Sequence, residues 1–556
     1  MSEVKIRLRT DPRAPFVKTS VEKGTLLSEL ANRYQPDLPY RILAAKVNRQ
    51  IRELGKTIDE PEDVTLLDMR VNAVNLMYQR SLSLLYLKAI RDVIGRAEVF
   101  LGNSLNKGIY TMIRRGLKLS DAEIQAIDQR MREIVRADLP FIKEIVDREA
   151  ALAHLREDGS LGKVRLLENA SDFEWVAFYS LDGFRNYFYG QMLPSTGYIE
   201  HFELRAYRNG VLLRFPHAAK PDEIPPYTDE KKLYEAFGEA NQWGKLLGIS
   251  MAADLNERIA SDRVVEMIQL SEALHEKSIA GIADRIAKEN KRLILIAGPS
   301  SSGKTTFAHR LCIQLKVIGR DPLCLGTDDY FTDRADCPVN EFGEKDFENI
   351  SAIDSELFNN NMNALLRGEI VDIPRYNFRE GRKHFGERLT KGRKGQPIVI
   401  EGIHGLNEQL TRGIDDKEKF KIYISPLTAL NIDEHNRIPT TDIRFLRRMI
   451  RDARTRGIDA KRTIATWPSV RAGEDRNIFP FSGEADVLFN SAHIYEIAVL
   501  KKYAAPILGA IQETDEEYSE AYRLKRLLQF FKTIEEDSAI VNNSILREFI
   551  GGSIFE

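Results

Sequence analysis

The chain has 556 residues, of which 43% are hydrophobic and 29% charged, an ordinary globular balance that excludes disorder of the whole chain. At roughly 100–200 residues per compact domain, this length predicts about three or four domains. The 81 basic and 83 acidic residues leave a net charge of -2, so no overall basic excess indicates nucleic-acid binding.

Cysteine content and hydropathy indicate the cellular compartment in which the protein is expected. Cys312, Cys324 and Cys337 form no CxxC pair, which argues against a disulfide framework or a cysteine-rich zinc site. No apolar run approaches the roughly 18 residues of a membrane span. The first ten residues, MSEVKIRLRT, lack the apolar stretch of a signal peptide. We therefore expect a cytoplasmic protein without a membrane partner.

Residues 1–70 are predicted to form a small β-grasp-like domain. VKIRLR, from Val4, alternates apolar and charged residues like a half-buried strand, and 16–21 is its expected hairpin partner. The other expected elements are a helix over 25–34 and short strands at 42–47 and 64–67. The segment contains no catalytic constellation.

Residues 71–225 are predicted to form a second, α+β domain. Its helices are expected around 82–93 and 121–135, and a β-rich stretch follows Tyr198. Asn209-Gly210 in that stretch predicts a hairpin turn. The prolines of KPDEIPPYTDE mark the boundary to a helical connector over 226–290.

Residues 291–500 have the pattern of a doubly wound α/β domain. Short apolar runs alternate with longer helical segments, as buried parallel strands do. The runs lie at 293–297, 323–325, 398–400, 422–424 and 487–489. A C-terminal helical extension over 501–556, with a helix at 522–534, is expected to pack on this domain.

The strongest motif is GPSSSGKTT, which fits G-x-x-x-x-G-K-[ST] between a predicted strand and a predicted helix. Glycines let backbone N–H groups turn toward phosphate oxygens, and the helix N-terminus adds partial positive charge. The lysine can bridge β- and γ-phosphates and the threonine hydroxyl can hold magnesium. A chance glycine turn is the alternative, which the strand–loop–helix context disfavours. The motif predicts an ATP–Mg²⁺ site formed by Gly298, Pro299, Ser300, Ser301, Ser302, Gly303, Lys304, Thr305 and Thr306.

Acidic residues follow two of the predicted strands. Asp328 and Asp329 come after the second strand, and Glu401 ends the third. Strand ends are where this fold places groups that bind magnesium or accept a proton. The alternative for either position alone is a loop cap or a surface charge.

The segment DIRFLRRMIRDARTRG concentrates arginines on a predicted helix. Helical spacing puts Arg444, Arg448 and Arg451 on one face. Arginines at this density repel one another, so we expect an anionic partner, with nucleotide phosphates the first candidate. A solvated charged helix and a nucleic-acid contact are the alternatives.

Together these motifs resemble the uridine kinase and phosphoribulokinase family of P-loop kinases, over residues 291–500. In TDDYF the resemblance makes Asp328 the general base, beside Lys304 as a catalytic cation. The family's E-G matches Glu401-Gly402, and its arginine-rich lid matches RFLRRMIRD. The resemblance therefore implies Thr305 and Glu401 as metal ligands, and as phosphate-lid residues it implies Arg444, Arg447, Arg448 and Arg451.

Two further segments are similar to the family's acceptor site. FENISAID places Glu348 where a ribose-binding aspartate is expected, and PRYNF places Tyr376 at a base- or sugar-contacting tyrosine. Gly381 stands where uridine kinases carry a base-reading histidine. Glu348 is also one methylene longer than the aspartate, so uridine specificity is not carried over.

The N-terminal regions have resemblances of their own. Residues 1–70 are similar to the TGS domain, most closely in AAKVNRQIRELGKTI, and 71–225 resemble the second additional domain of threonyl- and alanyl-tRNA synthetases. That domain holds a metal with H-x-x-x-H and C-x-x-x-H pairs. The corresponding positions here are Asn103, Lys107, Phe188 and Met192, which do not suit zinc, so we expect no editing hydrolysis.

The leading hypothesis is therefore an ATP-dependent kinase that phosphorylates a hydroxyl of a nucleoside or a related small molecule. An RNA- or ribosome-associated NTPase is the second hypothesis, and a kinase of a non-nucleoside polyol is the third. RNA binding and homo-oligomer formation are left open.

Overall fold

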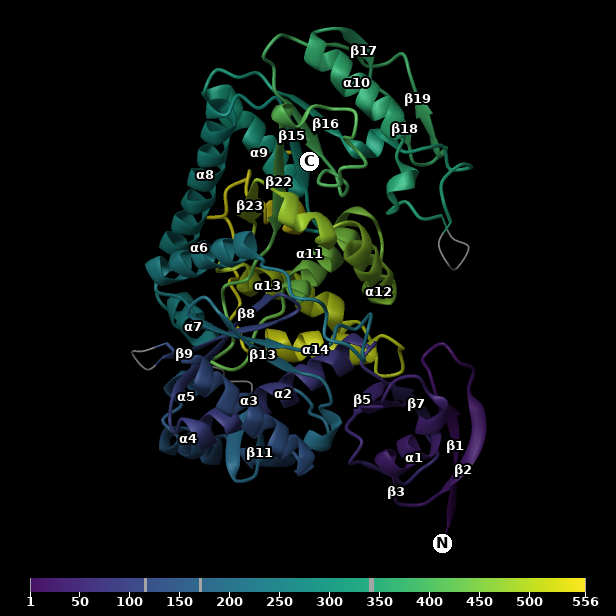
Figure 1. Ribbon diagram of the computed structural model, residues 1–556, viewed down its shortest axis with the longest axis vertical. Coiled ribbons are helices and arrows are strands. Elements are labelled where there is room, and N and C mark those ends of the chain that lie inside the picture. Colours follow the sequence, from purple (N-terminus) through teal and green to yellow (C-terminus); the bar gives the residue numbers. More distant parts are fainter. Residues whose placement is uncertain (1, 115–117, 170–172, 340–344, 556) are drawn as a thin grey trace.

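A computed structural model describes residues 2–114, 118–169, 173–339 and 345–555 of the chain. The N-terminal region lies at the lower end of the long axis in Figure 1, and the strands and helices between about residues 290 and 400 lie at the upper end. The C-terminal helices lie between the two ends. Among the described residues, no helix combines the length and hydropathy that a bilayer crossing requires.

The N-terminal region is a mixed sheet of five strands with one helix, α1 (Leu27–Tyr34). The first strand pairs in parallel with the last and antiparallel with the second. Alternate residues of the first strand are buried, which confirms the predicted half-buried strand. In spatial order the strands are β2 (Val17–Glu22), β1 (Glu3–Arg9), β7 (Asp63–Leu67), β4 (Ala44–Val47) and β5 (Gln50–Arg52). Two short strands, β3 (Thr25–Leu26) and β6 (Thr57–Ile58), form a separate pair.

The next region contains two antiparallel sheets. One has the order β13 (Glu203–Tyr207), β14 (Gly210–Arg214), β9 (Gly108–Arg114) and β8 (Glu98–Leu105). The other has the order β10 (Ile142–Asp147), β11 (Trp175–Leu181) and β12 (Phe184–Tyr187). The predicted hairpin is present, with Tyr207 opposite Gly210, so the turn lies one residue earlier than expected. The helices are α2 (Asn72–Val93), α3 (Asp121–Arg136), α4 (Arg148–Glu157) and α5 (Leu161–Asn169).

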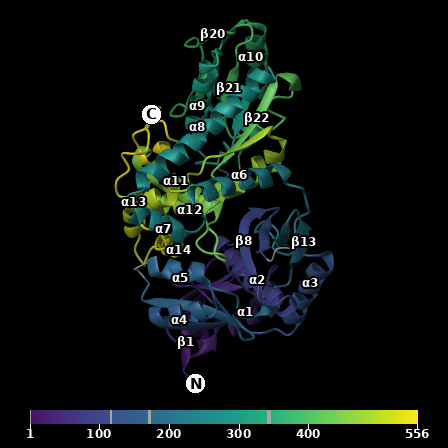
Figure 2. The ribbon, with the colours of Figure 1, turned by 90° about the vertical axis from the view of Figure 1, so that its left-hand side faces the viewer.

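Three helices then lead to the α/β region: α6 (Lys231–Leu247), α7 (Ala252–Ala260) and α8 (Val264–Lys288). The last turns of α8 bury Ile279, Ile282 and Ile286 in one core with Phe307 and Leu311 of the following helix α9 (Lys304–Val317). Figure 2 shows α8 beside α9. The long connecting helix thus supports the element that carries the phosphate loop.

The α/β region is built on a sheet of five strands, every neighbouring pair of which is parallel. Each of the five predicted apolar runs is a strand. In spatial order they are β16 (Leu323–Gly326), β21 (Ile398–Glu401), β15 (Leu293–Ala297), β22 (Lys419–Ser425) and β23 (Val487–Asn490). The helices after α9 are α10 (Ser355–Arg367), α11 (Thr440–Thr455), α12 (Ala460–Asn477) and α13 (Glu496–Gly509). Two small hairpins pair β17 (Ile370–Asp372) with β20 (Leu389–Lys391) and β18 (Arg375–Asn377) with β19 (Arg382–His384).

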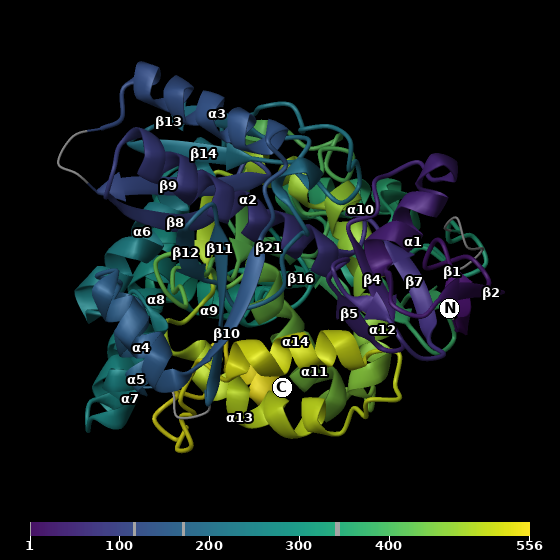
Figure 3. The same cartoon turned by 90° about the horizontal axis from the view of Figure 1, so that it is seen from below.

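The C-terminal extension contains α14 (Tyr518–Leu528) and a short helix α15 (Arg547–Ile550). It packs on the α/β region as predicted, and it also contacts the second region, which the sequence did not indicate. The ring of Phe530 stacks on Phe173 at 4.9 Å, and one hydrophobic core joins residues from 151–189, 247–268, 430–511 and 518–550. Figure 3, from below, shows α14 beside α11 and α13.

Candidate active site

The phosphate loop, defined as residues 298–306, leaves the central strand β15 and opens helix α9. Gly303 adopts a φ of 86° immediately before the helix begins, a conformation that glycine reaches without steric cost. A side chain at Gly298 would collide with the backbone carbonyl of Ile424 in β22. The Ser301 and Ser302 hydroxyls are buried and have no hydrogen-bond partner among the described residues. Backbone geometry therefore requires both glycines, and the loop holds polar groups free for a ligand.

Lys304 spans this loop. Its Nζ donates to the carbonyl oxygens of Gly298 at 3.0 Å and Pro299 at 3.2 Å. Desolvation lowers the pKa of the Lys304 ammonium, while the carboxylates of Glu401, Glu548 and Asp328 act in the opposite direction. The lysine is thus a cation held close to three acids at the mouth of the loop.

The predicted acids lie where two neighbouring parallel strands end. Asp328 follows β16 and Glu401 ends β21, so their carboxyl groups share one edge of the sheet with the loop. Desolvation raises the pKa of Glu401 to about 7, Lys304 lowers it and Asp328 raises it further. Desolvation also raises the pKa of Asp328, against the effect of Lys304. The Asp328 side chain nevertheless keeps solvent contact, so a small molecule can reach it.

The oxygen atoms beside the loop fit a magnesium ion. Thr305 Oγ1 donates to Glu401 Oε1 at 3.3 Å, which places a hydroxyl and a carboxylate side by side next to Lys304. Mg²⁺ prefers hard oxygen ligands and is usually held by one or two protein groups together with phosphate oxygens and water. Among the described residues no group of three or more His, Cys, Asp or Glu side chains could hold a metal without such outside ligands.

The four arginines predicted as a phosphate lid divide into two pairs. Arg444 forms a bidentate ion pair with Glu474 of α12, with Nη2 2.8 Å from Oε2, and Arg447 pairs with Glu496 at the same distance. Both guanidinium groups are fully buried. The expectation that these two arginines need an outside anion is therefore corrected, since protein carboxylates neutralise them.

The two buried arginines, Arg444 and Arg447, also contact the backbone of the phosphate loop. The Nη1 atoms of Arg444 and Arg447 lie 3.4 Å from the carbonyl oxygens of Ser300 and Ser301. Arg448 and Arg451 remain at the site, where Arg448 Nη1 donates to Ser300 Oγ at 2.9 Å. Arg451 interacts electrostatically with Asp452 and with Glu548. Unlike Arg444 and Arg447, these two arginines are partly exposed beside the loop.

The two predicted acceptor residues have different surroundings. Desolvation and the nearby Glu474 raise the pKa of Glu348 to about 7, against the effect of Arg448. Glu348 therefore lies at the arginine side of the loop. Tyr376 is buried in an aromatic group with Phe331, and its hydroxyl has no hydrogen-bond partner among the described residues.

Position 381 shows what replaces the family's histidine. Gly381 has a φ of 71°, and the side chain of Arg334 packs directly against its Cα. The Arg334 amide also donates to the Gly381 carbonyl at 2.7 Å. The side chain of Arg334 thus fills the space beside Gly381. Gly381 itself lies on the same hairpin as Tyr376.

Two carboxylates at the loop were missed by the sequence reasoning. Glu474 Oε1 accepts the amide N–H of Ser300 at 3.0 Å, and Glu548 Oε2 accepts the Thr306 hydroxyl at 2.8 Å. They lie 174 and 242 positions from their loop partners, in segments without a motif. No local signal in the sequence identifies them.

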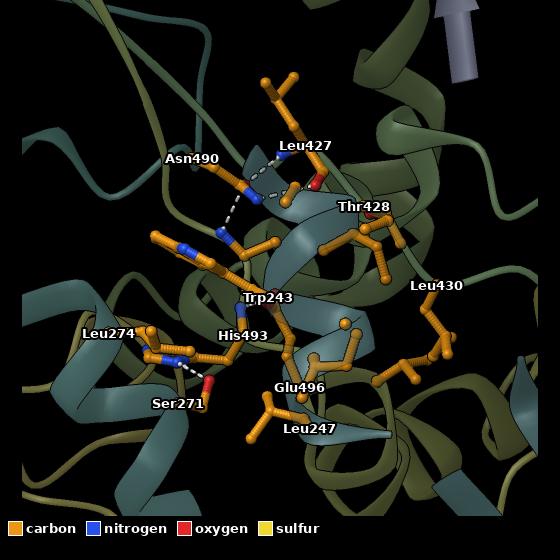
Figure 4. Close-up of a pocket in the computed structure, with 17 residues that line it drawn as sticks. Trp243, Leu247, Ser271, Leu274, Leu427, Thr428, Leu430, Asn490, His493 and Glu496 are labelled. Atoms are coloured by element: carbon orange, nitrogen blue, oxygen red, sulfur yellow. Dashed lines mark hydrogen bonds between the residues drawn. The ribbon is translucent and has the colours of Figure 1, made fainter. Parts of the chain in front are cut away.

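A separate pocket lies where the connecting helices meet the end of β23 (Figure 4). Trp243, Leu274 and Leu430 are among its lining residues, and the described lining includes no residue of the phosphate loop. The Asn490 side chain accepts from the Leu427 amide at 2.7 Å and donates to the Leu427 carbonyl at 3.0 Å. Ser271 and His493 also hydrogen-bond each other, at 2.9 Å. These polar groups serve the packing of the connector against the sheet.

The four positions that correspond to the synthetase metal ligands lie in different surroundings. Lys107 lies 3.8 Å from Asp475 of α12, whereas Phe188 stacks on His435 with ring centroids 6.5 Å apart. Met192 is fully buried among apolar residues. Lys107, Phe188 and Met192 thus pack or pair with other parts of the chain, whereas the Nδ2 atom of the buried Asn103 has no hydrogen-bond partner among the described residues.

Known proteins match two different parts of the chain. Residues 293–498 match the model of the Phosphoribulokinase / Uridine kinase family. The solved structure of a possible uridine kinase from Bacillus stearothermophilus is 18% identical and covers 36% of this chain and 88% of that chain, with a TM-score of 0.24.

The N-terminal part matches curated ligases. The threonine–tRNA ligase of Syntrophotalea carbinolica is 30% identical over 210 residues, which are 36% of this chain and 33% of the ligase. Threonine–tRNA ligase 1 of Bacillus subtilis is 28% identical over 182 residues, 33% of this chain and 28% of the ligase. The chain thus spans about a third or less of the length of these relatives. Residues 293–498 thus match the model of a kinase family, and the N-terminal part of the chain is similar to threonine–tRNA ligases.

Proposed function

We propose that this protein transfers the terminal phosphoryl group of ATP to a hydroxyl of a nucleoside or a related small molecule. The observation that carries the proposal is the cluster of Lys304, Asp328 and Glu401 at one edge of the parallel sheet, beside a loop built to hold phosphate. The match of residues 293–498 to a kinase family supports the same reaction class.

Within this site the residues take distinct parts in the transfer. Backbone amides of the loop and the start of α9 bind phosphate oxygens, and Lys304 neutralises charge on the group that moves. Thr305 and Glu401 would hold Mg²⁺, which supplies further charge neutralisation when bound. Arg448, which bonds Ser300 of the loop, and Arg451, which interacts with Glu548, would stabilise further charge on the phosphates.

Asp328 is the proposed general base. It is open to solvent, close to Lys304, and positioned to take the proton of an acceptor hydroxyl. Its neighbour Asp329 is already engaged, because Arg388 Nη1 donates to Asp329 Oδ2 at 2.6 Å. The two adjacent aspartates therefore have different proposed roles: Asp328 acts on the acceptor, and Asp329 holds Arg388 in the surrounding structure.

The acceptor is read by groups around Tyr376 and Glu348. The unpartnered Tyr376 hydroxyl offers one hydrogen bond to a sugar or base, and the Glu348 carboxyl offers another. Arg334 fills the space beside Gly381, so pyrimidine reading by a histidine at that position is replaced. We therefore favour an acceptor set wider than uridine.

An acceptor screen tests the proposal. Purified protein with γ-labelled ATP and Mg²⁺ would be offered nucleosides and simple polyols, and we expect label on at least one small-molecule hydroxyl. ATP hydrolysis that no nucleoside or polyol changes, with no labelled product, would contradict the proposal. A labelled polyol with no labelled nucleoside would assign the third hypothesis.

The second function, an RNA-associated NTPase, is favoured by one observation, the 24–30% identity of the N-terminal part to threonine–tRNA ligases. Those ligases act on tRNA, so the same assay should be repeated with tRNA in place of small acceptors. Stimulation of hydrolysis by tRNA alone would select this function over phosphoryl transfer to a small molecule.

A further inference from the structure

The C-terminal helix α15 places a carboxylate on the phosphate loop. Glu548 Oε2 accepts two hydrogen bonds from Thr306, one from the backbone amide at 3.3 Å and one from the hydroxyl at 2.8 Å. Thr306 lies in the first turn of α9, where backbone N–H groups have no partner within the helix. In loops of this type such groups hold phosphate oxygens.

Glu548 also interacts with two cations, Lys304 and Arg451, that a nucleotide phosphate would meet at the same place. Its carboxylate raises the pKa of Lys304 and counteracts the desolvation of Arg451. It also raises the pKa of Glu401, since both groups are acids at one site. An anion in this place therefore meets the loop amide, the lysine and a lid arginine together.

The backbone that carries Glu548 is firmly attached. Phe549 is buried in one core with Phe307 of α9, and the Arg447 guanidinium lies 4.8 Å from the centre of its ring. Arg454 donates to the carbonyl oxygens of Glu548 at 3.1 Å and Phe549 at 3.3 Å. Only the half-buried Glu548 side chain needs to rotate for its carboxylate to leave Thr306.

We propose that Glu548 is a residue of the nucleotide site, where its carboxylate competes with a phosphate group for the donors of Thr306. The proposal rests on the proposed function, because it takes residues 298–306 as the ATP site. Two anions cannot accept the same two hydrogen bonds, so ATP must displace the Glu548 side chain. The C-terminal extension thereby sets the ATP affinity of the loop below the value that the loop alone would give.

Equilibrium binding of Mg–ATP to the full-length chain tests this competition. Glu548→Gln removes the charge with almost no change of shape, and Glu548→Ala removes the acceptor as well. We expect Kd for Mg–ATP to fall by at least about tenfold in both variants, the scale of one lost hydrogen bond to a charged group. Glu536→Gln is the matched control, since Glu536 is an exposed acid of the same extension that bonds the Ser538 amide. Its Kd should stay at the wild-type value.

Two further probes locate the competition at the phosphates. Inorganic tripolyphosphate should gain the same factor as ATP in the Glu548 variants, whereas adenosine should gain none. Equal or weaker Mg–ATP binding by both variants, with normal binding by the wild type, would overturn the role of Glu548 and leave the kinase proposal standing. Absence of binding by the wild type and all variants at millimolar Mg–ATP would overturn the nucleotide site and this proposal with it.

Discussion

Asp328 and Asp329 show how far two adjacent carboxylates can differ in role. Asp329 is fixed by Arg388 and accepts the Tyr376 amide at 3.4 Å, while Asp328 faces Lys304 and solvent. A carboxylate that already accepts from an arginine is a poor proton acceptor. The side-chain contacts therefore favour Asp328 over Asp329 as the proposed base, and Asp328 is also the residue that the sequence resemblance implied.

Asp328→Asn should lower kcat by about 10²–10⁴-fold, the usual contribution of a general base. Mg–ATP affinity should stay within about threefold of the wild type, because loop contacts and not Asp328 hold the phosphates. Steady-state kinetics with the acceptor from the screen, together with ATP titration, measure both quantities. Asp329→Asn is the control, and we expect it to affect thermal stability more than kcat. Wild-type kcat in Asp328→Asn would remove Asp328 from the mechanism.

The pH dependence of kcat reports the same group. A base works only when deprotonated, and desolvation raises the pKa of Asp328 above the ordinary value of about 4. The rate should therefore fall as pH decreases, with a midpoint above about 4. A pH–rate profile of the wild type measures this limb. The residual rate of Asp328→Asn should lack it, and a limb that persists unchanged there would belong to another group.

The raised pKa of Glu348 predicts the direction in which the free energy of unfolding changes with pH. Its pKa is raised to about 7 in the folded chain, so the folded state favours the protonated carboxyl and stability is lost as pH rises through the window from about 4 to 7. Glu348→Gln removes this cost. The variant should gain about 1–3 kcal/mol relative to the wild type between pH 5 and pH 8. Urea unfolding at both pH values checks it, and a difference that does not change with pH would contradict the assignment.

At the scale of one element, α11 divides its arginines between support and function. Arg444 and Arg447 are buried and paired, so they join α11 to α12 and α13 beside the loop. Arg448 and Arg451 are partly exposed and face the loop and its acids. A single helix thus provides both the foundation of the phosphate loop and the charge that would face a bound phosphate.

Arg444→Ala should destabilise the chain by up to about 3–5 kcal/mol, because it removes the buried partner of Glu474 and leaves that carboxylate with only Arg471 and the Ser300 amide. Arg448→Ala removes a partly exposed group and should change the free energy of unfolding by less than about 1 kcal/mol. Its effect should instead appear as a lower kcat. Chemical unfolding and kinetics on the pair separate the two roles, and similar stability losses in both variants would refute the division.

At the scale of the whole molecule, one hydrophobic core joins four segments that are distant in sequence. Leu167 of α5, Met267 of α8, Met449 of α11 and Leu524 of α14 all belong to it. The N-terminal sheet is tied on by ion pairs, since Lys46 and Arg49 both contact Glu516 before α14. Because they share this core, we expect the second region, the connecting helices and the helices of the α/β region to unfold as one cooperative unit.

Hydrogen exchange measures that cooperativity. Peptides from the buried faces of α5, α8, α11 and α14 should open with free energies that agree within about 1 kcal/mol, since global unfolding exposes them together. Peptides from the exposed β17–β20 hairpin, where Ile370 and Leu389 are largely solvent-exposed, should open more easily and serve as the internal contrast. Much easier opening of α5 than of α11 would show independent domains.

The sequence by itself determined the strands and the phosphate-loop motif of the α/β region. All five strands of the parallel sheet, the loop with Gly303 before α9, and the acids at two strand ends follow from local patterns of burial and glycine placement. These features are set by residues close in the chain. The start of α2, ten residues earlier than predicted, was missed because its first turns are buried by tertiary contacts that blur the helical pattern.

The tertiary structure alone decided which charges meet. Arg444 pairs with Glu474, 30 positions away in the sequence, and Arg447 pairs with Glu496, 49 positions away. Thr306 donates to Glu548, which lies 242 positions away. No pattern in the sequence couples residues at such separations, since electrostatic pairing depends on distance in space and on desolvation. Two of the four arginines that the sequence predicted as a phosphate lid, Arg444 and Arg447, are therefore buried in ion pairs and contact the backbone of the loop.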